Sequence, residues 1–256
     1  MIDIHSHLLP GIDDGADDLA TAVAMCRLAA ADGCEAIVAT PHQRTTHWEN
    51  ADLGRLAALR DEVARAAGGA IEIHLGGEVR VDADFLAELA AGDGTHGPAP
   101  LAGSRYLLLE LDRHHLRIDP EELVHELVVG DWRPIFAHPE FIPALAGDLD
   151  RVGELAAAGA LFQITAMSLT GDFGRTARQV CHDLLDRGLV HFVASDCHGV
   201  GHRPPGLSRA RRVLAERWGE ETATRLTGDN PRAVIEDRPV AAGTPAPAAP
   251  ARQLAR

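Results

Sequence analysis

Short apolar runs alternate with amphipathic segments along most of the chain. The runs at 1–7, 37–40, 71–75, 106–111, 134–137, 161–165 and 190–195 have the length of strands. The segment 51–67 is a clear amphipathic helix, because Leu53, Leu56, Leu59 and Val63 share one face and Gly68 ends it. Further helices are predicted near 17–32, 84–91, 119–129, 149–158, 174–187 and 207–226, and 92–103 is predicted as a loop. About seven βα units of this kind indicate an α/β fold with a parallel sheet, open or closed.

Potential metal ligands recur where the predicted strands end. His5 and His7 stand two residues apart on a strand, so their side chains point to the same face. In a barrel of parallel strands, all strand ends of one polarity meet on one face. The candidate ligands are His5, His7, Asp14, His42, Glu78, Glu110, His138, Asp196 and His198. We therefore expect a polynuclear metal site and, with it, a hydrolytic reaction.

The types of ligand indicate which metals could bind and which reaction they would support. A mixture of imidazole and carboxylate suits Mn, Fe or Zn, whereas thiolate-rich sites would favour Zn or an iron–sulfur cluster more specifically, and none is found in this sequence. Two or three ions of this kind polarise phosphoryl oxygens, lower the pKa of a bridging water and neutralise the charge of an in-line attack.

Composition excludes several classes of function. The 256 residues carry a net charge of −14, which argues against nucleic-acid binding. All 24 basic residues are Arg, so no Schiff-base chemistry on Lys is available, and any cationic clamp must be Arg or metal. No apolar run is long enough for membrane insertion, and no secretory signal is visible, so we expect a cytoplasmic protein. The four cysteines form no CxxC pair, and we expect them to be free thiols.

The pattern Cys-x5-Arg, used by cysteine-dependent phosphatases, occurs twice. The copy from Cys181 to Arg187 lies inside a predicted helix and has no glycine, so we interpret it as a chance match. The copy from Cys197 to Arg203 follows a strand and contains two glycines. Asp196 beside the thiol would raise its pKa and repel phosphate, which makes a thiolate mechanism the minor alternative. Arg203 itself is a good candidate for a bidentate phosphate clamp.

Several motifs together resemble a known family. They are the opening Met-Ile-Asp-Ile-His-Ser-His-Leu-Leu-Pro-Gly-Ile-Asp-Asp-Gly, Ala-Thr-Pro-His at 39–42, Gly-Glu-Val-Arg at 77–80, Ala-His-Pro-Glu at 137–140, Ser-Leu-Thr-Gly at 168–171 and Ser-Asp-Cys-His at 195–198. This set resembles the polymerase-and-histidinol-phosphatase (PHP) superfamily. More narrowly, it resembles the manganese-dependent protein-tyrosine phosphatases of bacterial capsule and exopolysaccharide biosynthesis.

The resemblance covers residues 1 to about 237 and implies one domain, a distorted (β/α)7 PHP-type barrel. The Pro/Ala-rich tail 238–256 has a composition that builds no core, and we expect it to be disordered.

The resemblance also implies a grouping of the ligands around two or three Mn2+ ions, with Fe or Zn as alternatives. One ion would be held by His5, His7, Glu78 and Asp196, and a second by Glu78 as a bridge with Glu110 and His138. The third would be held by Asp14, His42 and His198. The residues expected at the reaction centre are Arg203, Glu78 and Asp196.

The function implied is that of a metal-dependent phosphomonoesterase. It would be a protein-tyrosine phosphatase acting on a bacterial tyrosine kinase in polysaccharide biosynthesis, by attack of a metal-activated water on phosphorus. The alternatives are a small-molecule PHP phosphatase, such as a histidinol-phosphatase, and a weakly active kinase-binding PHP domain.

Two positions depart from the pattern of the family. Phe141 stands where these phosphatases usually have an Arg that is thought to help bind phosphate, and Gln43 stands where another His is frequent. Phe141 would either leave a phosphate contact unmade or pack against an aromatic substrate.

Overall fold

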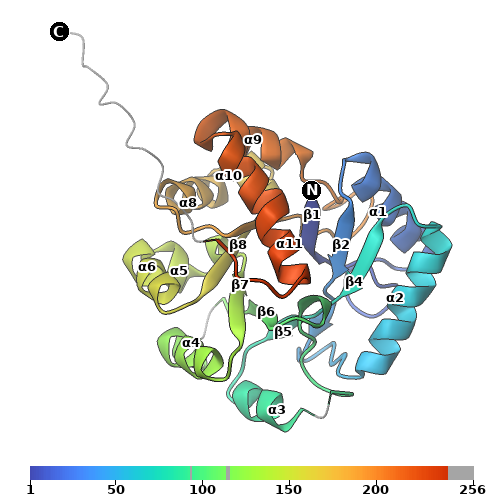
Figure 1. Cartoon of the computed structure of the whole chain (residues 1–256), viewed down its shortest axis with the longest axis horizontal. Helices are drawn as coiled ribbons and strands as arrows, with labels where there is room; N and C mark the ends of the chain where they lie inside the picture. Colours follow the sequence, from blue (N-terminus) through green and yellow to red (C-terminus); the bar gives the residue numbers. More distant parts are fainter. Residues whose placement is uncertain (93, 114–115, 242–256) are drawn as a thin grey trace.

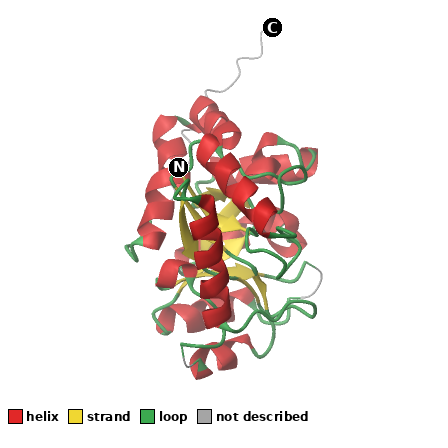
Figure 2. Ribbon diagram, turned by 90° about the vertical axis from the view of Figure 1, so that its right-hand side faces the viewer, coloured by secondary structure: helices red, strands yellow, loops and turns green. Residues whose placement is uncertain are grey.

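A cylinder of parallel strands forms the centre of the computed structural model, which describes residues 1–92, 94–113 and 116–241 (Figure 2). All the paired strands run parallel. They are β1 (Ile2–Ser6), β2 (Ala36–Ala39), β3 (His42–Gln43), β4 (Glu72–Leu75), β5 (Glu78–Arg80), β6 (Tyr106–Glu110), β7 (Arg133–Ala137), β8 (Leu161–Thr165) and β9 (Phe192–Ala194).

Two of these strands are continuations of others. Only two residues separate β3 from β2, and Gly76 and Gly77 separate β5 from β4. Hydrogen bonds carry the pairing across both interruptions, from Gly76 N to Ala39 O (2.8 Å) and from Glu78 N to Pro41 O (3.1 Å). Both glycines are needed for space: a Cβ on Gly76 would lie 2.6 Å from a Leu101 methyl, and one on Gly77 would lie 2.0 Å from Gln43 Oε1. The described residues thus build seven strands.

The seven strands close into a barrel. His7 N donates to Cys197 O (2.9 Å) and Asp196 N donates to His5 O (2.9 Å), which joins β1 to the chain that leaves β9. The expected (β/α)7 barrel in a single domain is confirmed.

Helices surround the barrel on all sides (Figure 1). They are α1 (Leu19–Ala31), α2 (Leu53–Ala67), α3 (Phe85–Ala91), α4 (Pro120–Val129), α5 (Pro143–Ala146), α6 (Leu149–Ala157), α7 (Ala166–Thr170), α8 (Arg175–Asp186), α9 (Ser208–Trp218), α10 (Glu220–Thr224) and α11 (Asn230–Ile235), with the short turns η1 (Leu101–Gly103), η2 (Pro139–Phe141) and the π-helical η3 (Arg225–Asp229). The predicted helix at 51–67 corresponds to α2, which is capped by Asp52 and ends at Gly68 with a φ of 66°. No described helix is long and apolar enough to cross a bilayer.

Alternate strand residues separate two apolar cores. In β6, Leu107 and Leu109 belong to the large cluster under the helices, while Tyr106 and Leu108 belong to a smaller one. Because successive side chains of a strand point to opposite faces, the smaller cluster lines the inner face of the barrel. Val234 of α11 closes this inner core, which leaves the carboxyl ends of the strands free to carry polar groups.

The structure differs from the sequence predictions in a few elements. The helix predicted at 207–226 is divided into α9 and α10 at Gly219, which has a φ of 90°. The loop predicted at 92–103 contains η1, and the two- and three-residue strands β3 and β5 were missed because so few residues show no periodicity. Of the tail expected to be disordered, residues 242–256 lie outside the described residues.

Candidate metal centre

The nine expected ligands gather at the carboxyl ends of the barrel strands. Four of them, in β1, β3, β5 and β6, lie within strands near this end, and the others lie on the loops that follow β1, β7 and β9. Ligand atoms come within 4.8 Å of one another in three groups: His5, His7 and Asp196; His7, Asp14, His42 and His198; and His42, Glu78 and Glu110. His138 joins them through its Nε2, which lies 2.7 Å from Glu78 Oε1. All nine candidates therefore come together at one place.

The innermost group is fully buried. The Nε2 atoms of His5 and His7 lie 3.3 Å apart, and each is 3.4 Å from Asp196 Oδ1. Glu78 Oε2 lies 3.5 Å from the first of these nitrogens and 3.4 Å from the second. Four donor atoms thus face one another across a space of the size that a divalent cation needs.

Glu78 occupies the centre of the cluster. Its Oε2 lies 2.8 Å from His42 Nδ1, and both atoms are buried without a hydrogen-bond partner. A buried carboxylate oxygen left without a donor is costly, and a cation beside it removes that cost. The donor types and this unpartnered oxygen both fit a metal site. Glu78 touches His5, His42 and His138 and thus lies between expected ligands from three different strands or loops.

The outermost group opens to solvent. Asp14 Oδ1 lies 3.4 Å from His42 Nε2 and 3.3 Å from His198 Nε2, and the Asp14 side chain is 47% exposed. This part of the cluster is therefore the part that solvent reaches.

A layer of polar groups behind the cluster fixes the imidazole rings. Asp13 Oδ2 accepts from His7 Nδ1 (2.9 Å) and from the backbone N of His42 (3.1 Å), and its Oδ1 accepts from Gly15 N (3.0 Å). Gln163 Oε1 lies 2.8 Å from His5 Nδ1. Such contacts orient a ligand ring with its other nitrogen toward the metal.

Neither supporting residue was predicted from the sequence. Asp13 and Asp14 both follow the first strand closely, which could have indicated a role for each, but only Asp14 was predicted as a ligand. Gly15 packs so closely that a Cβ there would lie 1.9 Å from His7 O, which explains the glycine at the end of this loop.

The local electrostatics favour a cation. Burial alone would lower the pKa of His7, but hydrogen bonds with Asp13, Asp196 and Glu78 outweigh it and hold that pKa well above its ordinary value. Burial likewise works to raise the pKa of Glu78, yet the charges of His5 and His42 keep it well below its usual range. The carboxylates of the centre therefore stay ionised in a buried place, where they attract positive charge strongly.

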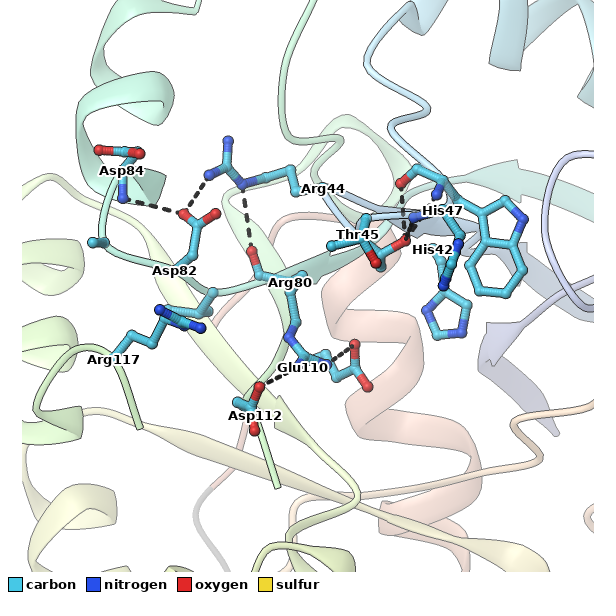
Figure 3. A pocket seen from close by; sticks show the side chains of 14 residues that line it. His42, Arg44, Thr45, His47, Arg80, Asp82, Asp84, Glu110, Asp112 and Arg117 are labelled. Atoms are coloured by element: carbon cyan, nitrogen blue, oxygen red, sulfur yellow. Dashed lines mark hydrogen bonds and ion pairs between the residues drawn. The ribbon is translucent and has the colours of Figure 1, made fainter. Parts of the chain in front are cut away.

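Two arginines reach the cluster. Arg203 pairs with Asp196 Oδ2, its Nη1 lies 3.3 Å from His198 Nε2, and its Cζ stands 5.8 Å from the centre of the Phe173 ring. Arg80 lies 3.1 Å from Glu110 Oε2 and also pairs with Asp112 (Figure 3). Both guanidinium groups therefore contact carboxylates of the cluster.

A third arginine, Arg44, is engaged elsewhere. It pairs with Asp82 and Glu88, and its side chain is only 8% exposed. It is therefore a structural residue beside the mouth of the barrel rather than a free cation.

A guanidinium lies over the ring of Phe141, the residue that replaces the expected Arg. Arg113, on the loop after β6, has its Cζ 5.2 Å from the centre of this ring. The ring also packs against His138 (6.2 Å between centroids) and Phe173 (5.8 Å). The positive charge missing at position 141 is thus present nearby, from a different loop.

Gln43, the other departure, points away from the cluster. Its Nε2 donates to Asn50 O (2.7 Å) and Gly97 O (3.2 Å), and its Oε1 accepts from Ala99 N (2.8 Å). It ties β3 to two loops, and its polar atoms are engaged there rather than at the metal centre.

The four cysteines are free thiols, as expected, and all four are buried. Burial raises the pKa of the Cys197 thiol to about 12, and it also raises the pKa of the Cys181 thiol. Both side chains belong to the apolar core under the helices. A thiol in that environment is protonated at neutral pH and points away from the cluster, which argues against the thiolate mechanism.

The sequence profile of the family described as capsular polysaccharide synthesis, CpsB/CapC, matches residues 1–236. The chain belongs to the CpsB/CapC family. It is 31% identical to tyrosine-protein phosphatase YwqE of Bacillus subtilis (strain 168), over 96% of each chain. It is 29% identical to tyrosine-protein phosphatase CpsB of Streptococcus pneumoniae, over 93% of this chain and 99% of that one.

Solved structures agree with the CpsB/CapC assignment. A crystal structure from the pair YwqE of B. subtilis and CpsB of S. pneumoniae, described as unique metal-dependent tyrosine phosphatases, superposes with a TM-score of 0.88. It is 29% identical and covers 98% of this chain and 100% of its own. Histidinol phosphate phosphatase of Lactococcus lactis, 15% identical over 89% of this chain and 96% of its own, superposes with a TM-score of 0.56 and shares the fold alone.

Proposed function

We propose that this protein is a metal-dependent tyrosine-protein phosphatase of capsular polysaccharide synthesis. The observation that carries the proposal is the convergence of nine His, Asp and Glu side chains on one end of the barrel. The relatives YwqE and CpsB are named tyrosine-protein phosphatases, and the match extends over nearly the whole chain.

The nine residues would hold two or three ions, and Mn2+ is the metal that we propose. The donors are imidazoles and carboxylates, and none of them is a thiolate. Such a set suits Mn or Fe better than it suits a metal that prefers thiolate ligands. His5, His7 and Asp196 would hold the buried ion, with Glu78 bridging to the ion held by Glu110 and His138. Asp14, His42 and His198 would hold the solvent-facing ion.

The bound ions would polarise the phosphoryl oxygens and lower the pKa of water, which supplies the nucleophile for attack on phosphorus. The protein contributes orientation and charge. Asp13 and Gln163 keep two imidazole rings turned toward the centre. Arg203, beside Asp196 and His198, would bind the equatorial oxygens of the phosphate and stabilise the charge that develops on them.

The physiological substrate that we propose is a phosphotyrosine-bearing bacterial tyrosine kinase. The family assignment to capsular polysaccharide synthesis and the names of the relatives support a phosphorylated protein as the substrate.

The test begins with protein stripped of metal by a chelator. It should hydrolyse no phosphotyrosine peptide, and adding Mn2+ should restore turnover, with elemental analysis giving two or three ions per chain. Fe2+ and Zn2+ are added in parallel. Histidinol phosphate is assayed beside the peptide, and faster turnover of that ester would favour a small-molecule phosphatase.

Variants connect the activity to the cluster. Glu78→Gln should lose metal and nearly all activity, because the central bridging carboxylate is gone. His74→Ala is the matched control, since His74 lies on β4, pairs with Glu72 and belongs to none of the ligand groups. Full activity in stripped protein, or a metal-loaded protein that cleaves no ester, would refute the proposal.

A further inference from the structure

A cavity of 530 Å³ opens at the mouth of the barrel beside the metal centre. Ligands and cofactors usually occupy cavities of roughly 300–1,000 Å³. His42 lies at one end and Arg117 at the other, with the pairs of Arg44 and Asp82 and of Arg80 and Glu110 between them (Figure 3). Two of the proposed metal ligands, His42 and Glu110, therefore form part of its wall.

One wall of this cavity is a fixed aromatic surface. The indole of Trp48 lies nearly parallel to the His42 ring, at 10° and with 5.4 Å between centroids. Trp48 N donates to Thr45 Oγ1 (2.9 Å) and its carbonyl accepts from Thr45 N (3.0 Å), so a short turn holds the residue in place. The side chain is half-buried and lines the cavity. One face of the indole thus lies against a proposed ligand, the His47 ring lies 5.9 Å away at 66°, and the remaining part of the side chain lines the cavity.

Another aromatic residue near the centre, Phe141, is half-buried and packs against neighbouring side chains. The Phe141 ring contacts His138, Phe173 and the guanidinium of Arg113, and it is not among the residues that line this cavity. Within the described part of the lining, Trp48 is the only Phe, Tyr or Trp. An aromatic group that enters this cavity therefore meets Trp48.

We propose that this cavity is the binding site for the aromatic ring of the substrate, and that Trp48 stacks on that ring. The inference rests on the proposed function for the class of substrate, and adds where the leaving group lies. With its phosphate on the cluster beside His42, an aryl phosphate would extend its ring along the indole. Phosphoserine and small alkyl phosphates have no ring to place there, so the cavity favours aryl esters.

Kinetics of two Trp48 variants test the proposal. Trp48→Leu keeps apolar bulk against His42 but removes the aromatic face, and it should raise KM for a phosphotyrosine peptide and for phenyl phosphate about fivefold. Trp48→Phe keeps a smaller aromatic face and should raise KM for both esters less than Trp48→Leu does. The inhibition constant of inorganic phosphate, which has no ring, should be unchanged in both variants, as should the metal content.

Two results would overturn the assignment. If KM and the phosphate inhibition constant rose together, or if metal were lost, Trp48 would act through His42 and not on the ring. If neither constant changed, the ring would bind elsewhere.

Fluorescence gives a readout that needs no turnover. The chain has three tryptophans, and Trp218 donates from Nε1 to Asp186 Oδ1 on the helical exterior. The probe is a peptide in which an uncleavable phosphonate replaces the phosphate of phosphotyrosine. It should change the fluorescence of wild type and of the control Trp218→Phe, but not that of Trp48→Phe.

The two proposals fail separately. A protein that cleaves no ester but shows the Trp48 signal would retain the ring site and lose the proposed function. An active phosphatase with no Trp48 signal and unchanged KM in Trp48→Leu would retain the function and lose the ring site.

Discussion

Replacing Asp13 with Asn should weaken metal binding, although Asp13 is not itself a proposed ligand. Its fully buried carboxylate accepts hydrogen bonds from the His7 ring and from the backbone N–H groups of His42 and Gly15. The two donors His7 and His42 share Oδ2, and the third uses Oδ1. Whichever way an Asn amide is turned, its NH2 faces another N–H donor, so at least one contact becomes repulsive.

The magnitude follows from the role of these contacts. Removing a group that orients a ligand imidazole typically costs 10–100-fold in metal affinity, or about 1.4–2.8 kcal/mol. We expect a loss in this range for Mn2+, because Asp13 supports two proposed ligands at once. Since the ligands themselves remain, activity at saturating Mn2+ should recover in large part.

The assay is competition for Mn2+ between the protein and a fluorescent chelator, followed by phosphatase kinetics at rising Mn2+. Asp17→Asn is the matched control, because Asp17 lies on the same loop with an exposed side chain. Equal Mn2+ affinity in Asp13→Asn and wild type would refute the idea that this carboxylate holds the rings in place.

Three further outcomes are expected. Cys197→Ser should keep most of the activity, because its thiol is buried with a pKa of about 12; an inactive variant with its metals bound would restore the thiolate mechanism. Arg203→Ala should lower kcat/KM by ~10²-fold, equivalent to about 3 kcal/mol, with metal content unchanged, and a wild-type rate would exclude its role on phosphate. Burial, and to a smaller extent the charge of Arg225, lowers the pKa of His191 in the folded protein to about 4. Because the unfolded chain therefore binds a proton at His191 at higher pH than the folded protein does, the stability of the fold should decrease as the pH falls from 6.5 to about 4. The loss is at most about 3 kcal/mol, and thermal melting against pH should flatten in His191→Asn; an unchanged slope would contradict this reasoning.

The sequence alone determined the fold class and the set of residues at the centre. Strand-length apolar runs alternate with helices, and such alternation permits little besides a parallel sheet. Once the sheet is parallel, strand ends of one polarity meet, so a His or carboxylate at each strand end, such as His138 or Asp196, is expected at a common place. That argument uses only local pattern and the geometry of one fold, which is why it succeeded without coordinates.

The tertiary structure decided which groups support that set. Asp13 and Asp14 are adjacent and chemically identical in the sequence, and only the packing of the loop turns one behind His7 and the other toward His42. Arg113 reaches Phe141 from another loop, a contact between residues far apart in the chain that no periodicity encodes.

The tertiary structure also decided the reactivity of the Cys197 thiol and the interruptions in two barrel strands. The Cys197 thiol has a raised pKa because the fold buries it, whereas its sequence motif alone left a thiolate mechanism open. Gly76 and Gly77, between β4 and β5, allow the close approach of Leu101 and Gln43. Strands β3 and β5 have only two and three residues, too few to show a pattern of their own. The sequence specifies which elements form and which chemical groups they carry. Burial and contacts between distant residues then set the pKa and the partners of each group, and these two factors arise only when the whole chain has folded.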